Sequence, residues 1–363
     1  MKTQTITRNP PTPCKTTARV FLAGGLNVMS APGGGEVQMT ATASALAKIG
    51  LRAKLWRPWE HKLAEGDCLH LFGSLPEHIP TIDAARRQGV RVVLSTIAWF
   101  DLASYWREPG RLSRRLGAAC RYVLRANWPS LPSWRRSLYH SVDMLLPNSS
   151  SEADQLMRLF QVPARRIHVV PNGADPRFAI ADAGQFERKY GLRDFVLSIG
   201  RIEPRKNQLG LIRALKDTDM PLVVVGQPVP GHMAYHEACL REAGSNVHFV
   251  GHINHDAPML ASAYGACRCL ALTSWFETPG LVALEAAMSG VPLVLPRGGS
   301  GHEYFGNQAL YVGPKNLEEI REAVRAAFKM ERNEHLARRV QKQFTWESVA
   351  RITRRAYEKQ GNP

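Results

Sequence analysis

Residues 267–296 read CRCLALTSWFETPGLVALEAAMSGVPLVLP, and this stretch decides the fold. A short apolar run leads into a polar loop, then into an alanine- and leucine-rich segment that stops at Gly290, then into a second apolar run. Such an alternation predicts two buried strands joined by a helix. Strands that alternate with helices form parallel sheets with right-handed crossovers, so the stretch predicts an α/β protein.

The same alternation extends in both directions along the chain. From residue 18 onward, a first set of strands is predicted for ARVFLAGG, RAKLW, CLHLFGS, RVVLSTIA, DMLLPNS and RIHVVPNG. After a polar stretch over residues 175–190, a second set is predicted for DFVLSIG, PLVVVGQ, NVHFVGH, RCLALTS, VPLVLP and ALYVGP. We therefore expect two doubly wound, Rossmann-like domains that face each other across a cleft, with ligands beyond the carboxyl ends of the strands.

The domain boundaries follow from these patterns. Residues 1–16 carry three prolines and too little apolar content to pack, so we expect a disordered tail. The first domain is expected over residues 17–175 and the second over residues 176–343. Residues 344–363 are expected to hold a C-terminal helix that starts near Thr345.

Two glutamates stand near the start of the helix expected after Pro279. Glu277 lies in the loop before it, Gly280 and Leu281 open it, and Glu285 lies more than a turn inside. A helix N-terminus binds phosphate through its N–H groups, and carboxylates accept hydrogen bonds from sugar hydroxyls. Glu285 also interrupts an apolar stretch, where a buried carboxylate needs a partner. The alternative is a coincidence of two glutamates on an exposed helix.

A basic turn, Gly200-Arg201-Ile202-Glu203-Pro204-Arg205-Lys206-Asn207, follows the run DFVLSI. The planar fork of arginine and the flexible ammonium of lysine both suit a diphosphate. A solvated basic turn is the alternative.

Two glycine-rich segments also follow predicted strands. Gly33 and Gly34 directly precede a helix, where an anionic group is able to approach bare amides. Gly298 and Gly299 follow VPLVLP and lead to Glu303, which adds a further wall to the same cleft. A plain turn is the alternative for the first segment.

The order of these segments, together with Pro171-Asn172-Gly173 and Asp175, resembles the family 4 retaining glycosyltransferases, which have the two-domain GT-B fold. The resemblance covers nearly the whole chain after residue 17. It implies transfer of a sugar from a nucleotide-sugar donor to an acceptor, with retained anomeric configuration and with no metal ion or other cofactor. It also implies an acceptor domain first, a donor domain second, and a C-terminal helix that crosses back to the first domain.

The resemblance also assigns roles to residues. It implies that Arg201 and Lys206 hold the donor diphosphate, and that Glu277 lies at the donor sugar and Glu285 at the ribose. The further donor-binding residues are the glycines and neighbours named above: Gly33, Gly34, Gly200, Gly280, Leu281, Gly299 and Glu303. Fixed cations and a helix N-terminus stabilise the negative charge that develops on a departing diphosphate, so a metal is unnecessary.

One departure from the family concerns the first domain. Many relatives carry a histidine after its fourth strand, but here the segment reads Leu94-Ser95-Thr96-Ile97-Ala98-Trp99. His70, at the end of another strand, is the acceptor-side candidate. A satisfied structural histidine is the alternative for a strand position of this kind.

The charge of the chain calls for an anionic partner. The net charge is +16, of which +12 belongs to residues 1–190. Residues 105–139 hold eight arginines and three tryptophans against one acid, which suits a membrane surface with anionic lipids and then a lipid-linked or polysaccharide acceptor. A solvated helix face is the alternative.

The location of the protein is expected to be the cytoplasm, with peripheral association at the inner face of the membrane if that surface binds lipid. Six scattered cysteines without a CxxC pair fit a reducing compartment. No apolar run approaches the ~20 residues that span a bilayer, and the N-terminus lacks a secretion signal.

Two metal-like patterns are set aside. Asp217-Thr218-Asp219 has the form of a metal-binding DxD, but it precedes a predicted strand and so lies away from the expected cleft. His232, His236, His248, His252 and His255 crowd together with Cys239, but they contain no HExxH and no closed zinc set.

Three other functions compete with sugar transfer. A sugar phosphorylase or a nucleotide-sugar epimerase is compatible with the same fold. A protein that binds nucleic acid or another anionic surface is favoured by the pI of about 9.9. The motifs clustered in the second domain count against that last function. Nucleic acid is therefore not an expected partner of this protein.

Overall fold

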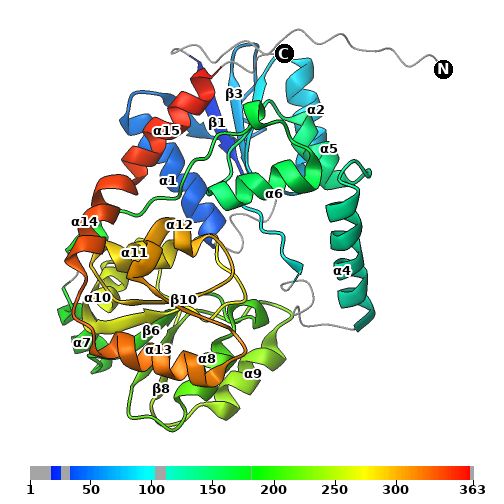
Figure 1. The fold of residues 1–363 in the computed structure, drawn as a ribbon. Coiled ribbons are helices and arrows are strands. Elements are labelled where there is room, and N and C mark those ends of the chain that lie inside the picture. The colour runs from blue at the N-terminus through cyan, green and yellow to red at the C-terminus, as the bar shows by residue number, and fades with distance from the viewer. Residues whose placement is uncertain (1–17, 26–32, 103–111, 181, 360–363) are drawn as a thin grey trace. The chain divides into compact units, whose positions relative to one another are not determined.

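A computed structural model describes residues 18–25, 33–102, 112–180 and 182–359. The chain divides into two compact units (Figure 1). The first unit holds the described residues up to Ala98, residues Arg125–Pro171, and the chain from Val349 onward. The second holds the described residues of Trp99–Leu124 and Asn172–Ser348.

The first unit is built on a parallel sheet with the strand order β2-β1-β3-β4-β5. The strands are β1 (Arg19–Ala23), β2 (Arg52–Leu55), β3 (Cys68–Phe72), β4 (Arg91–Ser95) and β5 (Met144–Leu145). All five residues of β3 and of β4 are buried, as expected for central strands covered on both faces. Its helices are α1 (Gly34–Lys48), α2 (His78–Arg87), α5 (Trp134–Ser141) and α6 (Ser150–Phe160), and α4 (Leu112–Asn127) precedes α5.

The C-terminal helix α15 (Trp346–Glu358) contributes its buried residues Val349, Ala350, Thr353, Ala356 and Tyr357 mainly to this first unit. Buried Arg91 on β4 donates hydrogen bonds to the carbonyls of Ala356 and Lys359 at 3.4 and 2.7 Å. A guanidinium at this place satisfies carbonyls that the end of a helix leaves without a partner.

One detail of the sequence-based prediction is wrong. The run RIHVVPNG does not form a strand: it follows the 3₁₀ turn η1 (Ala164–Arg166), and only Ile167 bridges to Leu145. Because β5 is two residues long, it offers little edge to pair with. The polar stretch over residues 175–190 is structured. It contains η2 (Pro176–Ala179) and α7 (Gly184–Tyr190), and it places Phe178 and Phe186 in the core.

The second unit is built on a parallel sheet with the strand order β11-β10-β9-β6-β7-β8. The strands are β6 (Phe195–Ile199), β7 (Leu222–Val225), β8 (Val247–Gly251), β9 (Cys267–Ala271), β10 (Leu293–Pro296) and β11 (Leu310–Val312). The first three strands run outward from β6 in one direction and the last three run from β9 in the other. The strand order therefore reverses between β6 and β9, and such a switch point is where doubly wound sheets bind ligands.

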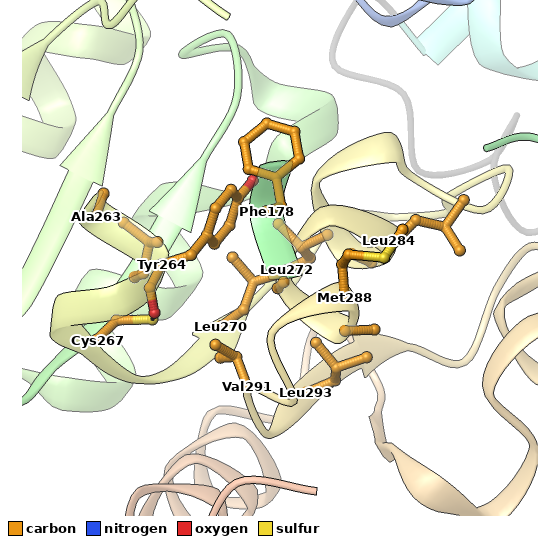
Figure 2. Packing of buried hydrophobic residues seen from close by; sticks show 14 of the residues in the cluster. Phe178, Ala263, Tyr264, Cys267, Leu270, Leu272, Leu284, Met288, Val291 and Leu293 are labelled. Carbon is orange, nitrogen blue, oxygen red and sulfur yellow. The ribbon is translucent and has the colours of Figure 1, made fainter. Parts of the chain in front are cut away.

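Helices cover both faces of this second sheet (Figure 1). One face carries α8 (Gln208–Leu215), α9 (Met233–Glu242) and α13 (Leu317–Lys329), whose apolar residues share a core with Val196, Leu222 and Val224. The other face carries α7, α10 (Pro258–Ala266), α11 (Leu281–Met288) and α14 (Glu334–Gln343), and its close packing is drawn in Figure 2. The short helix α12 (Gly301–Phe305) precedes β11.

Candidate functional site

The loops that follow β6 and β9 are joined at the switch point of the second sheet. The loop after β6 forms the 3₁₀ turn η3 (Pro204–Lys206). The amide of Trp275, in the loop after β9, donates to the carbonyl of Arg205 at 3.0 Å, and its indole Nε1 donates to the carbonyl of Pro204 at 3.1 Å. The basic turn and the glutamate-bearing loop therefore form one structure.

Asn207, the last residue of the basic turn, connects three loops through contacts that the sequence did not predict. It has a left-handed φ of 54°, and its Nδ2 donates to the carbonyls of Thr273 at 3.0 Å and Pro314 at 2.8 Å. The hydroxyl of Thr273 donates back to the carbonyl of Asn207 at 3.1 Å. Asparagine tolerates the left-handed region better than most residues, which accounts for its presence at this junction.

Lys206 and Glu277 form a buried ion pair at this junction. Lys206 Nζ lies 2.6 Å from Glu277 Oε1, and the side chains are 15% and 8% exposed. The hydroxyl of Ser274 donates to the same oxygen at 2.6 Å. Burial raises the pKa of the Glu277 carboxyl, but the positive charges of Lys206 and Arg205 and the two hydrogen bonds bring it below its usual value. Burial lowers the pKa of the Lys206 ammonium, and its attraction to Glu277 opposes that effect.

Arg201 and Arg205 share a buried carboxylate, that of Glu203. Arg205 Nη2 lies 3.1 Å from Glu203 Oε1, and Arg201 Nη2 lies 3.6 Å from the same atom. Arg201 remains about half exposed, and the guanidinium of Arg205 lies over the ring of Phe276, 5.5 Å from its centroid. Glu203, which the sequence did not assign to the site, therefore holds both guanidinium groups beside the Lys206 turn.

Gly200 lies beside the stem of Lys206. It has a φ of 152°, and a Cβ at this position would lie 3.4 Å from Lys206 Cε, in van der Waals contact. The positive φ, rather than a lack of space, favours glycine at this position.

The glycine-rich loop after β10 pairs with the Glu277 backbone. Glu277 N donates to the Gly298 carbonyl at 3.2 Å, and Ser300 N donates to the Glu277 carbonyl at 3.0 Å. Gly299 has a φ of 107°, and a Cβ there would lie 1.8 Å from the Glu277 carbonyl oxygen. Gly299 is thus required for the position of Glu277. Glu303 lies further on, in α12, with an exposed side chain.

Helix α11 starts directly after the Glu277 loop that follows β9. Gly280 is its N-cap residue with a φ of 85°, and Leu281 is its first residue. The first N–H groups of any helix have no partner within the helix, and they carry its positive dipole end. The helix thus begins at Gly280 and Leu281, as the sequence predicted, and its first turn lies next to the Lys206 and Glu277 pair.

Glu285, one turn further along α11, has both carboxylate oxygens engaged. Tyr264 Oη donates to Oε2 at 2.7 Å, and His255 Nε2 lies 2.9 Å from Oε1. The residue is 2% exposed. The sequence predicted that a carboxylate here would need a partner. Neither partner was predicted: Tyr264 belongs to no motif, and His255 belongs to a histidine cluster that suggested a zinc site.

Gly33 and Gly34 belong to the first unit, at the start of α1, where Gly33 is the N-cap residue. The Glu36 carboxylate accepts a hydrogen bond from the Gly33 amide, which is the carboxylate half of a capping box. A negative side chain therefore occupies the helix N-terminus where we expected an anionic ligand, and such a ligand has to displace it.

His70 is a buried residue of β3, 1% exposed, with both ring nitrogens engaged. Nδ1 lies 2.7 Å from Tyr357 Oη on α15, and Nε2 lies 2.9 Å from Ser95 Oγ on β4. Burial lowers the pKa of the imidazole to about 3. Both ring nitrogens are thus hydrogen-bonded within the first unit, as expected for the alternative of a structural histidine.

Asp217-Thr218-Asp219 lies elsewhere in the second unit. Residues 217–219 connect α8 to β7, at the amino end of that strand. Across the described residues, no group of three or more His, Cys, Asp or Glu side chains is placed to hold a metal ion. The part of the chain that the structure describes also contains no helix long and apolar enough to cross a bilayer.

Solved structures with the same architecture define the class of fold. Sucrose-phosphate synthase from Thermosynechococcus elongatus matches with a TM-score of 0.73 and 16% identity, over 93% of this chain and 98% of that chain. HepE from Anabaena, in complex with UDP and glucose, matches with a TM-score of 0.67 and 16% identity, over 93% and 98% of the two chains. The fold predicted from the sequence, GT-B, is confirmed.

The family follows from sequence matches. Residues 182–344 match the family model described as glycosyl transferases group 1, and residues 32–178 match the one described as glycosyltransferase family 4. The chain belongs to glycosyltransferase family 4 and is a glycosyltransferase of the GT-B type.

Curated relatives match at moderate identity. A D-inositol 3-phosphate glycosyltransferase from Stackebrandtia nassauensis is 34% identical over 42% of this chain and 38% of its own length. A glycogen synthase from Mycobacterium tuberculosis is 28% identical over 87% of this chain and 74% of its own length. The chain thus spans well under half of the first relative and about three quarters of the second.

Proposed function

We propose that this glycosyltransferase moves a sugar from a nucleotide-sugar donor to a hydroxyl acceptor, with retained anomeric configuration and without a metal ion. The buried Lys206 and Glu277 pair at the switch point of the second sheet, directly before the N-terminus of α11, carries the proposal. A cation, a carboxylate and a helix N-terminus together match the diphosphate and the sugar hydroxyls of such a donor.

The ion pair suggests how the donor engages. Lys206 and Arg201 bind the diphosphate together with the first amides of α11, and the lysine then divides its hydrogen bonds between phosphate and Glu277. A carboxylate oxygen of Glu277 is then able to accept a hydrogen bond from a hydroxyl of the donor sugar, while Ser274 keeps that carboxylate in place. Glu285 lies further along the same helix, in reach of the ribose.

Metal independence rests on the charge of the same loops. Arg201, Arg205 and Lys206 supply three cations against the two carboxylates of Glu203 and Glu277. Charge that builds on the departing diphosphate thus meets fixed positive groups in a partly closed site. One such preorganised group typically contributes roughly 10²- to 10³-fold in rate.

The donor and acceptor classes draw on the comparisons. HepE was solved with UDP-glucose, and a UDP-forming trehalose-phosphate synthase from Burkholderia xenovorans with glucose-6-phosphate. Relatives are named for transfer to inositol phosphate, glycogen and an O-antigen chain. We therefore propose a nucleoside diphosphate sugar as donor and a sugar or glycan hydroxyl as acceptor.

The test is a transfer assay in EDTA with UDP-, GDP- and ADP-linked hexoses against a panel of sugar, polyol and lipid-linked acceptors. We expect acceptor-dependent release of the nucleoside diphosphate, and NMR of the product is expected to show the anomeric configuration of the donor. Loss of turnover in EDTA that returns with magnesium overturns metal independence. A product of inverted configuration overturns retention.

We further propose that the chain meets an anionic lipid surface at the cytoplasmic face of the membrane through helix α4, and that its acceptor is lipid-linked. Leu112, Leu116 and Leu124 on this helix are exposed, as is Trp128 just beyond it. Exposed leucines and tryptophan beside arginines fit a membrane interface. Two of the arginines have structural roles, since Arg125 donates to the Pro129 carbonyl and Arg136 to Gln161. Residues 105–111 of the basic stretch lie outside the described residues.

Co-sedimentation with vesicles tests this surface. We expect binding to phosphatidylcholine vesicles that contain phosphatidylglycerol, and much weaker binding when Leu112 and Leu116 are both replaced by serine. Leu240→Ser is the matched control, because Leu240 is an exposed leucine on α9. Equal sedimentation of all three proteins, or binding that duplex DNA competes away, overturns the proposal.

A further inference from the structure

His255 lies in the loop between β8 and α10 and joins Glu285 to the surface of the second unit. Its side chain is 28% exposed, whereas that of Glu285 is 3% exposed. The imidazole Nε2 lies 2.9 Å from Glu285 Oε1. Of the two residues, His255 is therefore the one that a ligand in solution meets first.

The other oxygen of Glu285 is fixed from within the core. Tyr264 Oη donates to Oε2 at 2.7 Å, and the Tyr264 ring packs edge-on against Phe178 with centroids 5.5 Å apart (Figure 2). Because Tyr264 is fully buried, this hydrogen bond stays closed to solvent. Oε1 is thus the oxygen of Glu285 that a ligand hydroxyl can reach, and it is the one that His255 orients.

Arg177 sets the tautomer of His255. Its Nη2 lies 2.7 Å from the His255 carbonyl oxygen and 3.2 Å from Nδ1. A guanidinium only donates, so Nδ1 accepts and the proton of the neutral imidazole lies on Nε2, where it donates to Glu285. On protonation, Arg177 no longer donates to Nδ1, and the Nδ1–H is able to donate to Asp256 Oδ1, 3.3 Å away.

We propose that His255 is a positioning residue of the donor site, which in its neutral form holds Glu285 Oε1 ready for a ribose hydroxyl and which on protonation competes with that hydroxyl. This inference rests on the proposed function, in which Glu285 receives the ribose. Nε2–H donates to Oε1 in both states, but the imidazolium binds the carboxylate as a charge-assisted ion pair, which weakens that oxygen as an acceptor for the ribose.

The ionisable groups near the ring support this account. Glu285 on α11, Arg177 on η2 and Asp256 in the same loop contact the ring, and the neutral Tyr264 hydroxyl on α10 contacts Glu285. Burial lowers the pKa of His255, but the hydrogen bond and charge of Glu285 raise it by more, so the net pKa lies above its usual value. Nucleotide affinity is therefore expected to weaken as the pH falls through that pKa, and to be full on its alkaline side.

Calorimetric titration of the whole chain between pH 5.5 and 8.5 tests the proposal, with UDP, GDP, ADP and their 2′-deoxy counterparts as probes. At pH 8, His255→Gln is expected to stay within about threefold of the unmodified protein, because glutamine donates to Glu285 and accepts from Arg177 without titrating. His255→Ala is expected to lose roughly tenfold in affinity for the ribonucleotide and most of its preference over the deoxynucleotide.

The pH profile separates the outcomes. The nucleotide's own phosphate titration appears in every protein, so a pH dependence that disappears only in His255→Gln belongs to the imidazole. His232→Gln is the control, since His232 caps α9 without a side-chain hydrogen bond. If ribonucleotide preference and pH profile are unchanged in both His255 variants while the unmodified protein binds, the inference is wrong and the proposed function stands. If the unmodified protein binds no nucleoside diphosphate, both fail together.

Discussion

Lys206 Nζ and Glu277 Oε1 lie 2.6 Å apart, although the two residues are separated by 71 positions in the chain. The pair joins the loop after β6 to the loop after β9, at the place where the strand order of the second sheet reverses. Because parallel α/β sheets bind ligands at such a reversal, the proposed donor site uses the two side chains of this ion pair.

Removal of one member of this pair is expected to destabilise the protein. Lys206→Met leaves the Glu277 carboxylate buried without its cation, and we expect the free energy of unfolding to fall by about 3 kcal/mol. In the double variant Lys206→Met with Glu277→Gln, neither charge is left unpaired, so most of this loss returns while sugar transfer stays absent. Urea unfolding and the transfer assay measure the two effects, and Arg213→Ala, which opens an exposed ion pair with Glu242, is the control. Recovery of transfer in the double variant contradicts the assigned roles.

Gly299→Ala is expected to displace Glu277. The added Cβ meets the Glu277 carbonyl oxygen, so the bridge between the two segments has to open. Gly231→Ala is the matched control, because Gly231 also has a positive φ of 86° but open space around its Cβ position. We expect a stability loss of about 1 kcal/mol in the control from the backbone alone, and a larger loss together with impaired nucleotide binding in Gly299→Ala. Equal behaviour of the two variants in thermal unfolding and calorimetry argues against the positioning role of Gly299.

Tyr357→Phe is expected to weaken the attachment of α15 to the first unit. The change leaves His70 Nδ1 buried without its 2.7 Å partner. An unsatisfied buried polar group destabilises by about 1 to 3 kcal/mol. Denaturant unfolding measures this loss, and the transfer rate of the folded fraction is expected to stay unchanged in His70→Gln. A large fall in that rate, at full folding, supports instead the acceptor-side role that the sequence raised.

The same histidine predicts an acid-dependent loss of stability. Its folded pKa of about 3 lies below the value of about 6.5 for an unfolded histidine, so between these values the unfolded chain binds a proton that the folded chain does not. Stability is full above about pH 6.5 and is expected to fall by about 1.4 kcal/mol per pH unit as the pH drops toward 3. Urea unfolding at several pH values, compared with His70→Gln, isolates this contribution. An identical pH slope in the variant shows that His70 is not its source.

The sequence was sufficient for the fold and for the position of several site residues. Apolar runs and glycine stops placed Arg201 and Lys206 directly after β6, and Glu277 and α11 after β9. The place where a strand ends can be predicted from the residues on either side of it. The partners of these residues were not predictable in the same way. Asn207 and His255 act on groups that lie 66 and 30 positions away, and only the folded backbone brings them together.

The measurement that tests the central claim most directly is calorimetric titration of UDP, GDP and ADP, in EDTA, into the unmodified protein and into the Lys206→Met, Glu277→Gln double variant. We predict selective binding of one nucleoside diphosphate by the unmodified protein, and a loss of roughly 100-fold in the folded double variant. Binding of none of the three, or equal binding by both proteins, contradicts a donor site at this ion pair.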